Sequence, residues 1–160
     1  FPTRRSSDLA EGQGLPQNYQ EALKWHLLSA EQGYALAESN LGLMYEEGQG
    51  VQQNYEEAIK WYSFAAKKGL SGAQSKLGIM YQSGKGVIQD YKEAVRLYRQ
   101  SAKQGNTLGQ KYLGVMYVLG QGVPKDYVLA HMWFSLSGSK GYQSALKNIR
   151  LVEKKCLNQK

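Results

Sequence analysis

The chain has 160 residues, 42% of them hydrophobic, so it is long enough to bury the core of one domain. Its apolar runs cover only a few residues, which excludes a membrane-spanning helix, and its single cysteine, Cys156, cannot form an internal disulfide. The net charge of +7 is unevenly placed, because residues 10–66 hold two Lys and eight Glu whereas residues 67–160 hold sixteen Lys or Arg and four acidic residues.

The first nine residues, FPTRRSSDL, match no later segment of the chain. They read as the translation of TTC CCT ACA CGA CGC TCT TCC GAT CT, which resembles a common DNA-sequencing adapter. We therefore interpret residues 1–9 as an artefact rather than native sequence, which would leave the native N-terminus missing. Resequencing the source DNA across this junction tests the interpretation, and a continuous native reading frame would contradict it.

From Gly12 onward the sequence repeats every 36 residues. The segments that begin at Gly12, Gly48, Gly84 and Gly120 read GQGLPQNYQEALKWH, GQGVQQNYEEAIKWY, GKGVIQDYKEAVRLY and GQGVPKDYVLAHMWF. Each unit contains two helical patterns. The first is Ala37-x-x-x-Leu41-Gly42-x-x-Tyr45, whose spacing puts these residues on one helix face. Glycine within a helix costs about 1 kcal/mol relative to alanine, so we expect a close approach of a neighbouring helix to offset it.

The second helix of each unit has start and stop signals. Asn or Asp at the N-cap and glutamate three residues later predict a capping box in the first three copies. Glycine at the C′ position predicts the helix end. The N-caps are Asn18, Asn54, Asp90 and Asp126, the glutamates are Glu21, Glu57 and Glu93, and the terminating glycines are Gly33, Gly69, Gly105 and Gly141.

Short helix pairs at a fixed period predict an all-α fold, a right-handed α/α superhelix (solenoid) of 36-residue helix-turn-helix repeats. The motifs in ALAESNLGLMYEEGQGVQQNYEEAIKWYSFAAKKG, residues 35–69, and in its two successors resemble the Sel-one-like repeat (SLR) family, a relative of the tetratricopeptide repeats. One departure is Leu97, which stands where the other copies have Trp25, Trp61 and Trp133. We divide the chain into a partial repeat at 10–34, repeats at 35–69, 70–105 and 106–141, and a C-terminal capping helix and tail at 142–160. In the capping helix, Ala145 and Ile149 keep the apolar phase.

The resemblance implies a non-catalytic scaffold or adaptor that binds a protein or peptide partner without a cofactor or metal. It also implies a bacterial protein, for which we favour a periplasmic or exported location. In solenoids of this kind the first helices line the concave surface, so their outer faces give the candidate partner-binding residues. These are Leu36, Ser39, Leu43, Glu46, Glu47, Ser75, Ile79, Gln82, Leu108, Lys111, Val115 and Leu119. In the alternative interpretation, Leu43, Ile79 and Val115 only pack between helices.

Catalysis is the competing class of function. Ser137-x-x-Lys140 and Ser144-x-x-Lys147 satisfy the S-x-x-K pattern of penicillin-recognising serine hydrolases, but no S-D-N or K-T-G accompanies them. His26 and His131 align with packing positions of the other repeats, which indicates core histidines rather than ligands or bases.

The basic half of the chain raises the question of nucleic acid, which we do not favour because most tyrosines recur at core positions and few remain for base stacking. The opposite charges of the two halves would favour head-to-tail self-association or steer a charged partner. We favour the simpler alternative that these charges solvate helix faces.

Overall fold

The computed structural model describes residues 18–138 and 148–154, which form helices and connecting turns without a strand among them. The predicted all-α fold is therefore confirmed. The helices are α2 (Tyr19–Glu31), α3 (Ala35–Glu47), α4 (Tyr55–Lys67), α5 (Ser71–Ser83), α6 (Tyr91–Lys103), α7 (Thr107–Leu119) and α8 (Tyr127–Gly138), and residues 148–154 are also helical.

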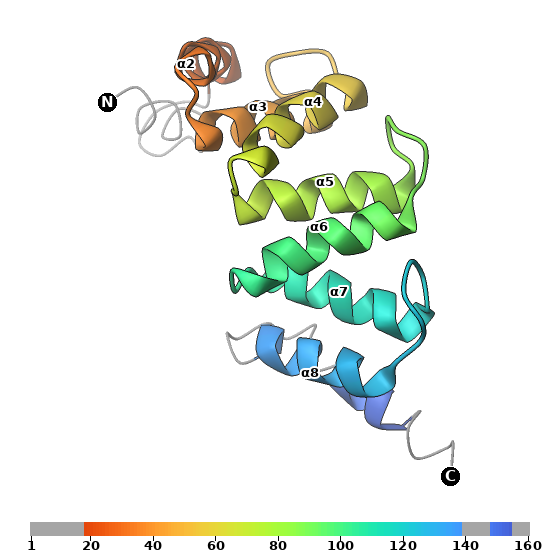
Figure 1. The fold of residues 1–160 in the computed structure, drawn as a ribbon. Helices are drawn as coiled ribbons and strands as arrows, with labels where there is room; N and C mark the ends of the chain where they lie inside the picture. Colours follow the sequence, from red (N-terminus) through yellow and green to blue (C-terminus); the bar gives the residue numbers. More distant parts are fainter. Residues whose placement is uncertain (1–17, 139–147, 155–160) are drawn as a thin grey trace.

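The helices stack in chain order (Figure 1). Within a repeat α3 packs on α4, α5 on α6 and α7 on α8, and successive repeats meet through α4 with α5 and α6 with α7. The first helices α5 and α7 also contact each other directly, whereas the second helices α4 and α6 have no comparable contact. The second helices α4 and α6 are therefore more widely separated than the first helices α5 and α7, and a cavity lies between α4 and α6 beside α5.

The N-caps of the second helices form as predicted. The Asn54 side chain accepts hydrogen bonds from the backbone N–H groups of Glu56 and Glu57 at 3.0 and 3.1 Å. Such caps satisfy backbone donors that have no partner within the helix. The equivalent caps are Asn18 to Glu21, Asp90 to Lys92 and Glu93, and Asp126 to Leu129.

The second half of the predicted capping box is wrong at Asn54 and Asp90. The backbone N–H of Asn54, which Glu57 should have accepted from, donates instead to the carbonyl of Tyr45 at 2.9 Å. This hydrogen bond closes the loop between the paired helices, and Glu57 is free to pair with Lys60 at 3.2 Å. The same loop closure recurs from Asp90 to Tyr81 and from Asp126 to Tyr117.

The second helices end at glycines, as predicted. Gly33, Gly69 and Gly105 have φ angles of +83°, +87° and +78°, a left-handed conformation that residues with a Cβ rarely adopt. Gly141, predicted to end the last helix, lies outside the described residues.

The glycines inside the first helices accommodate an aromatic ring. A Cβ atom on Gly78 would lie 2.6 Å from Cε1 of Tyr98, which belongs to the second helix of the same repeat. Gly42 faces Tyr62 and Gly114 faces Phe134 in the same way. The predicted close approach is confirmed, and the approaching group is a side chain of the paired helix. The three rings are among the largest fully buried side chains.

Candidate functional site

Three aliphatic side chains occupy equivalent positions on successive first helices. Leu43, Ile79 and Val115 lie 36 residues apart on α3, α5 and α7, and each is partly buried. We call these three residues the inner row. Leu36 at the start of α3 and Leu119 at the end of α7 flank the row and are 54% and 50% exposed.

The inner row also contributes to packing. Ile79 contacts a buried cluster that includes Val95 and Leu113, and Val115 contacts one that includes Phe134 and Val152. The alternative interpretation from the sequence, interhelical packing, is thus part of what these residues do. A partly buried side chain can both stabilise the stack and offer its outer surface to a ligand.

Glu46 joins two repeats. Its carboxylate accepts a hydrogen bond from the Tyr62 hydroxyl at 2.6 Å and pairs with the Lys76 ammonium group of α5 at 3.0 Å. Burial, together with the hydrogen bond to Glu46 and its negative charge, raises the pKa of Tyr62 well above its usual value. Tyr62 therefore remains a proton donor, and Glu46 is held in place. Sequence reasoning missed Lys76 because its partner lies 30 residues away, an interval that the 36-residue period does not indicate.

The candidate partner-binding residues on α5 mostly contact other side chains inside the helix stack. Ser75 is fully buried and its hydroxyl lies 2.7 Å from that of Ser101, so it cannot meet a partner. Gln82 accepts a hydrogen bond from the Tyr98 hydroxyl at 2.6 Å, which repeats the Glu46 arrangement with a neutral amide. Burial is the main cause that raises the pKa of Tyr98.

The remaining candidates lie at the two ends of the surface. Ser39 and Leu108 are partly buried, and Glu47 is exposed and accepts a hydrogen bond from the Gln49 side chain at 2.5 Å. Lys111 is partly buried, with its ammonium group 5.5 Å from the centre of the Tyr112 ring. The structure thus brings most of the predicted residues to one side of the first helices, and only Ser75 is fully inside.

The helical residues 148–154 cover the last repeat. Val152 is 1% exposed and packs with Ala130 and Phe134, and Ile149 packs against the same cluster. A cavity of about 200 Å³ lies between this segment and α7, lined by Val115, Leu119 and Leu151 among others. The predicted apolar phase of the capping helix is confirmed at Ile149, whereas Ala145 lies outside the described residues.

A second set of interactions crosses between repeats near the helix ends. The Lys68 ammonium group lies 2.6 Å from the carboxylate of Glu38, whose side chain is only 6% exposed. At the equivalent positions of the next repeat, the Gln104 amide donates to Gln74 at 2.9 Å. A neutral pair and a charged pair therefore perform the same structural task.

The first S-x-x-K serine has a structural role. Ser137 is fully buried and its hydroxyl donates to the Thr107 carbonyl at 3.1 Å, as Ser101 does to Ser71 at 2.7 Å. A nucleophile at this position has no access to a substrate. Ser144, Lys140 and Lys147 lie outside the described residues.

The two histidines differ. His26 is 2% exposed, and burial lowers its pKa, which confirms a core histidine. His131 is not in the core, since its side chain is 42% exposed and its Nε2 lies 3.3 Å from Glu153. Residues 148–154 add this contact, which the alignment of repeats did not predict. Within the described ranges there is no group of three metal-ligating side chains, and no helix there is long and apolar enough to cross a membrane.

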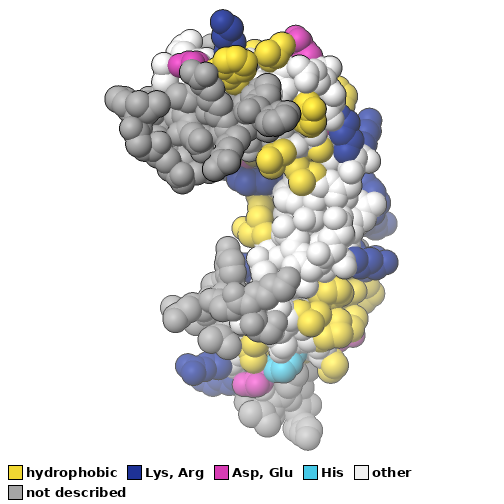
Figure 2. Space-filling model, turned by 90° about the vertical axis from the view of Figure 1, so that its left-hand side faces the viewer, with side chains coloured by type: hydrophobic (Ala, Val, Ile, Leu, Met, Phe, Trp, Pro, Cys, Tyr) yellow, Lys and Arg dark blue, Asp and Glu magenta, His cyan; other side chains and the backbone are white. Residues whose placement is uncertain are grey.

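Charge and apolar area are spread along the molecule. Figure 2 shows Lys and Arg side chains distributed over the length of the face it presents, with hydrophobic side chains gathered in separate patches along it. The periodic helix pairs define a helical-repeat solenoid. The inner row and the spread of charged and apolar side chains give it an extended surface.

The chain belongs to the Sel1 repeat family, because the family model matches residues 9–34, 35–70, 71–106 and 107–142. Proteins built of Sel1 repeats are generally non-catalytic scaffolds for protein interactions. Comparison with curated proteins finds no match.

Solved structures of bacterial proteins resemble the chain. A protective antigen present in uropathogenic Escherichia coli strains, which displays an SLR fold, is 34% identical with a TM-score of 0.87, over 98% of this chain and 34% of the antigen. A Sel1 repeat protein from Oxalobacter formigenes is 34% identical with a TM-score of 0.86, over 92% of this chain and 60% of that protein. The chain therefore spans about a third and three fifths of these two relatives. Cysteine rich protein B of Helicobacter pylori, 23% identical with a TM-score of 0.63 over 81% of this chain and 96% of that protein, shares the fold.

Proposed function

We propose that the chain binds a segment of a partner protein along the inner row and catalyses no reaction itself. The observation that carries the proposal is the register of Leu43, Ile79 and Val115, which repeats an aliphatic side chain at each first helix that the structure describes. A row of evenly spaced apolar side chains suits a partner helix or an extended peptide, which can place its own apolar residues at matching intervals.

The polar residues beside the row would set the direction of the bound segment. Glu46 and Lys76 form a pair beside the row, and Lys111 lies towards the end where Leu119 is exposed. A segment with a carboxylate near Lys111 and apolar residues over the row fits this arrangement, because opposite charges across an interface fix register more than affinity.

The test is selection of peptides from a random displayed library on the intact chain, followed by measurement of affinity for the selected peptides. Leu36→Glu and Leu119→Glu put a charge beside the row at exposed positions, so we expect binding to weaken at least about tenfold while helicity by circular dichroism is unchanged. Ile88→Glu is the matched control, because Ile88 is 89% exposed in the loop between α5 and α6. Equal binding by all three variants would contradict the proposal.

A second copy of the chain is the alternative occupant, arranged head to tail so that the acidic half meets the basic half. Sedimentation at low and high salt distinguishes it, since only self-association would give a salt-sensitive increase in mass without added peptide. Acylation by a labelled penicillin that is lost in Ser144→Ala would instead support the hydrolase alternative.

A further inference from the structure

The second helices carry a large apolar side chain at one equivalent position, which is a partly buried tryptophan in three of the four repeats and a leucine in the other. Trp61 on α4 packs against Ala30, Ala37 and Leu41, which fills the groove between α2 and α4 above α3. The wide spacing of the second helices makes such a groove necessary, and a large ring is the side chain that fills it. Trp133 on α8 packs in the same way against the cluster of α6 and α7.

Leu97 on α6 occupies this position in the third repeat. It is 2% exposed and packs with Ala73 and Leu77, the counterparts of Ala37 and Leu41. A cavity of about 590 Å³ opens at this groove between α4 and α6, within the range of roughly 300–1,000 Å³ typical of ligand pockets. Its inner wall includes Ala66, Leu77 and Leu97, and its mouth includes Lys67, Arg96 and Gln100.

The mouth of the cavity has an excess of positive charge. Arg96 is bound to the Glu93 carboxylate at 2.6 and 2.8 Å, so these two charges compensate each other. The side chain of Lys67 is exposed and forms neither an ion pair nor a hydrogen bond with any other residue that the structure describes. A carboxylate on a ligand would find its partner there.

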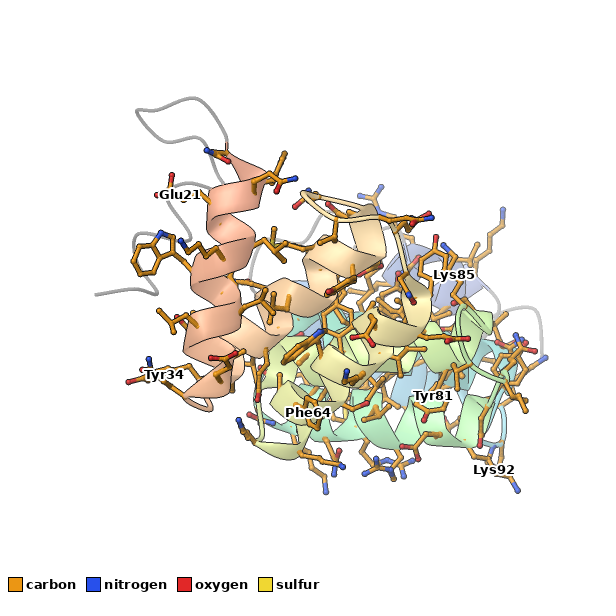
Figure 3. The ribbon with its side chains drawn as sticks, turned by 90° about the horizontal axis from the view of Figure 1, so that it is seen from above. Glu21, Tyr34, Phe64, Tyr81, Lys85 and Lys92 are labelled. Atoms are coloured by element: carbon orange, nitrogen blue, oxygen red, sulfur yellow. The ribbon has the colours of Figure 1, made fainter. Side chains whose placement is uncertain are left out.

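The cavity lies on the opposite side of the first helices from the inner row. Leu77 and Tyr81, which line it, and Ile79 of the inner row are on opposite faces of α5, because two residues turn a helix by about 200°. Figure 3 shows Tyr81 on the same side of the stack as Phe64 of α4 and Lys92 of α6. The two surfaces can therefore be occupied independently.

We propose that this cavity binds an aromatic side chain of the tryptophan type, presented by an acidic segment of a partner protein. The ring takes the place that Trp61 and Trp133 hold in the neighbouring grooves, and a carboxylate beside it pairs with Lys67. The indole N–H is not part of the recognition, since Nε1 of Trp61 is buried without a hydrogen-bond partner among the described residues. Trp25 donates its indole N–H to Glu21, but the counterpart of Glu21 at the cavity, Glu93, is already bound to Arg96.

The test mixes the intact chain with the peptide acetyl-Asp-(5-fluoro-Trp)-Asp-amide and monitors the peptide by fluorine NMR and the leucine methyl groups of the chain by proton–carbon NMR. We expect saturable binding, with ring-current shifts at the methyl groups of Leu77 and Leu97. Leu97→Trp fills the cavity with the residue that the other repeats carry and is expected to weaken binding at least about tenfold. Replacing the fluorotryptophan by naphthylalanine should preserve binding, and replacing it by alanine should abolish it.

Further variants keep the outcome decisive. Lys67→Glu changes an exposed residue, so it folds even if Leu97→Trp does not, and we expect it to weaken binding at least about tenfold. The Leu36→Glu and Leu119→Glu variants should bind this peptide as the wild type does, so failure here and failure of the proposed function are distinguishable. Undiminished binding by Leu97→Trp, undiminished binding by Lys67→Glu, or displacement by the alanine peptide would overturn the proposal.

Discussion

The packing of Tyr98 on Gly78 gives a prediction whose size can be worked out from the structure. In Gly78→Ala the new Cβ would lie 2.6 Å from Cε1 and 2.9 Å from Cδ1 of the Tyr98 ring. Carbon atoms prefer a separation of about 3.5–4.0 Å, so the ring would have to move by about 1 Å. The ring is fully buried, it stacks on Tyr112 at 5.3 Å between centres, and its hydroxyl is bound to Gln82.

Two opposing effects set the net result. Overpacking a filled core costs about 1–3 kcal/mol. Replacing glycine by alanine inside a helix gains up to about 1 kcal/mol. We therefore expect Gly78→Ala to lower the free energy of unfolding by about 1–2 kcal/mol, measured by urea denaturation with circular dichroism.

Gly72→Ala is the matched control on the same helix. Gly72 is the second residue of α5, and nothing lies within 4 Å of a Cβ added there. Only the helix-propensity effect remains, so we expect stability to rise by about 0.5 kcal/mol. Tyr98→Leu removes the obstructing ring. Adding Gly78→Ala to Tyr98→Leu should therefore lower the free energy of unfolding by less than Gly78→Ala lowers it in the wild type. A Gly78→Ala chain as stable as Gly72→Ala would refute the account of why glycine recurs within the first helices.

Three further predictions concern single interactions. Tyr62→Phe removes the hydrogen bond to the Glu46 carboxylate, and we expect the free energy of unfolding, measured by urea denaturation, to fall by about 1.5–3 kcal/mol. Lys68→Gln leaves the Glu38 carboxylate buried without its cation, so we expect the free energy of unfolding to fall by about 2 kcal/mol. This is below the range for fully buried pairs because Lys68 is partly solvated. The double variant Glu38→Gln/Lys68→Gln copies the neutral pair of the next repeat and should recover most of the lost stability. Burial holds the pKa of His26 below 6.5, so the unfolded chain binds a proton more readily than the folded chain. The free energy of unfolding should therefore decrease as the pH falls below about 6.5. In His26→Phe we expect a smaller decrease between pH 7.5 and 5.5.

The sequence predicted the positions that every repeat uses in the same way. Glycine next to an aromatic ring, Asn or Asp at the N-cap, and glycine at C′ recur at intervals of 36 residues, so a pattern search finds them. Each reflects a local requirement of backbone or packing that a single residue type satisfies. This is why the helix boundaries at Asn54 and Gly69 agree between prediction and structure.

The contacts between repeats could not be predicted in this way. Glu46 with Lys76, Glu38 with Lys68 and Ser101 with Ser71 are all separated by 30 residues, because each joins one repeat to the next across the stack. Their chemistry changes from copy to copy, as an ion pair, an amide pair or a hydroxyl to carbonyl bond. Serine recurs at the hydroxyl to carbonyl bond, as Ser101 and Ser137, but its backbone acceptor leaves no mark in the sequence. Only the three-dimensional arrangement therefore reveals the pairs and explains the burial of Ser75.

The direction of recognition in such a chain depends on the positions where the copies differ. A residue that recurs in every repeat stabilises the stack in every repeat, and it cannot distinguish one part of the surface from another. Glu47, Ser83 and Leu119 occupy one equivalent position with three different chemistries and are all exposed, which gives the surface a direction. Leu97 differs from its tryptophan counterparts inside the stack rather than on the exposed surface, since it is buried. The cavity of about 590 Å³ that Leu97 lines is the opening that the proposed partner ring would fill.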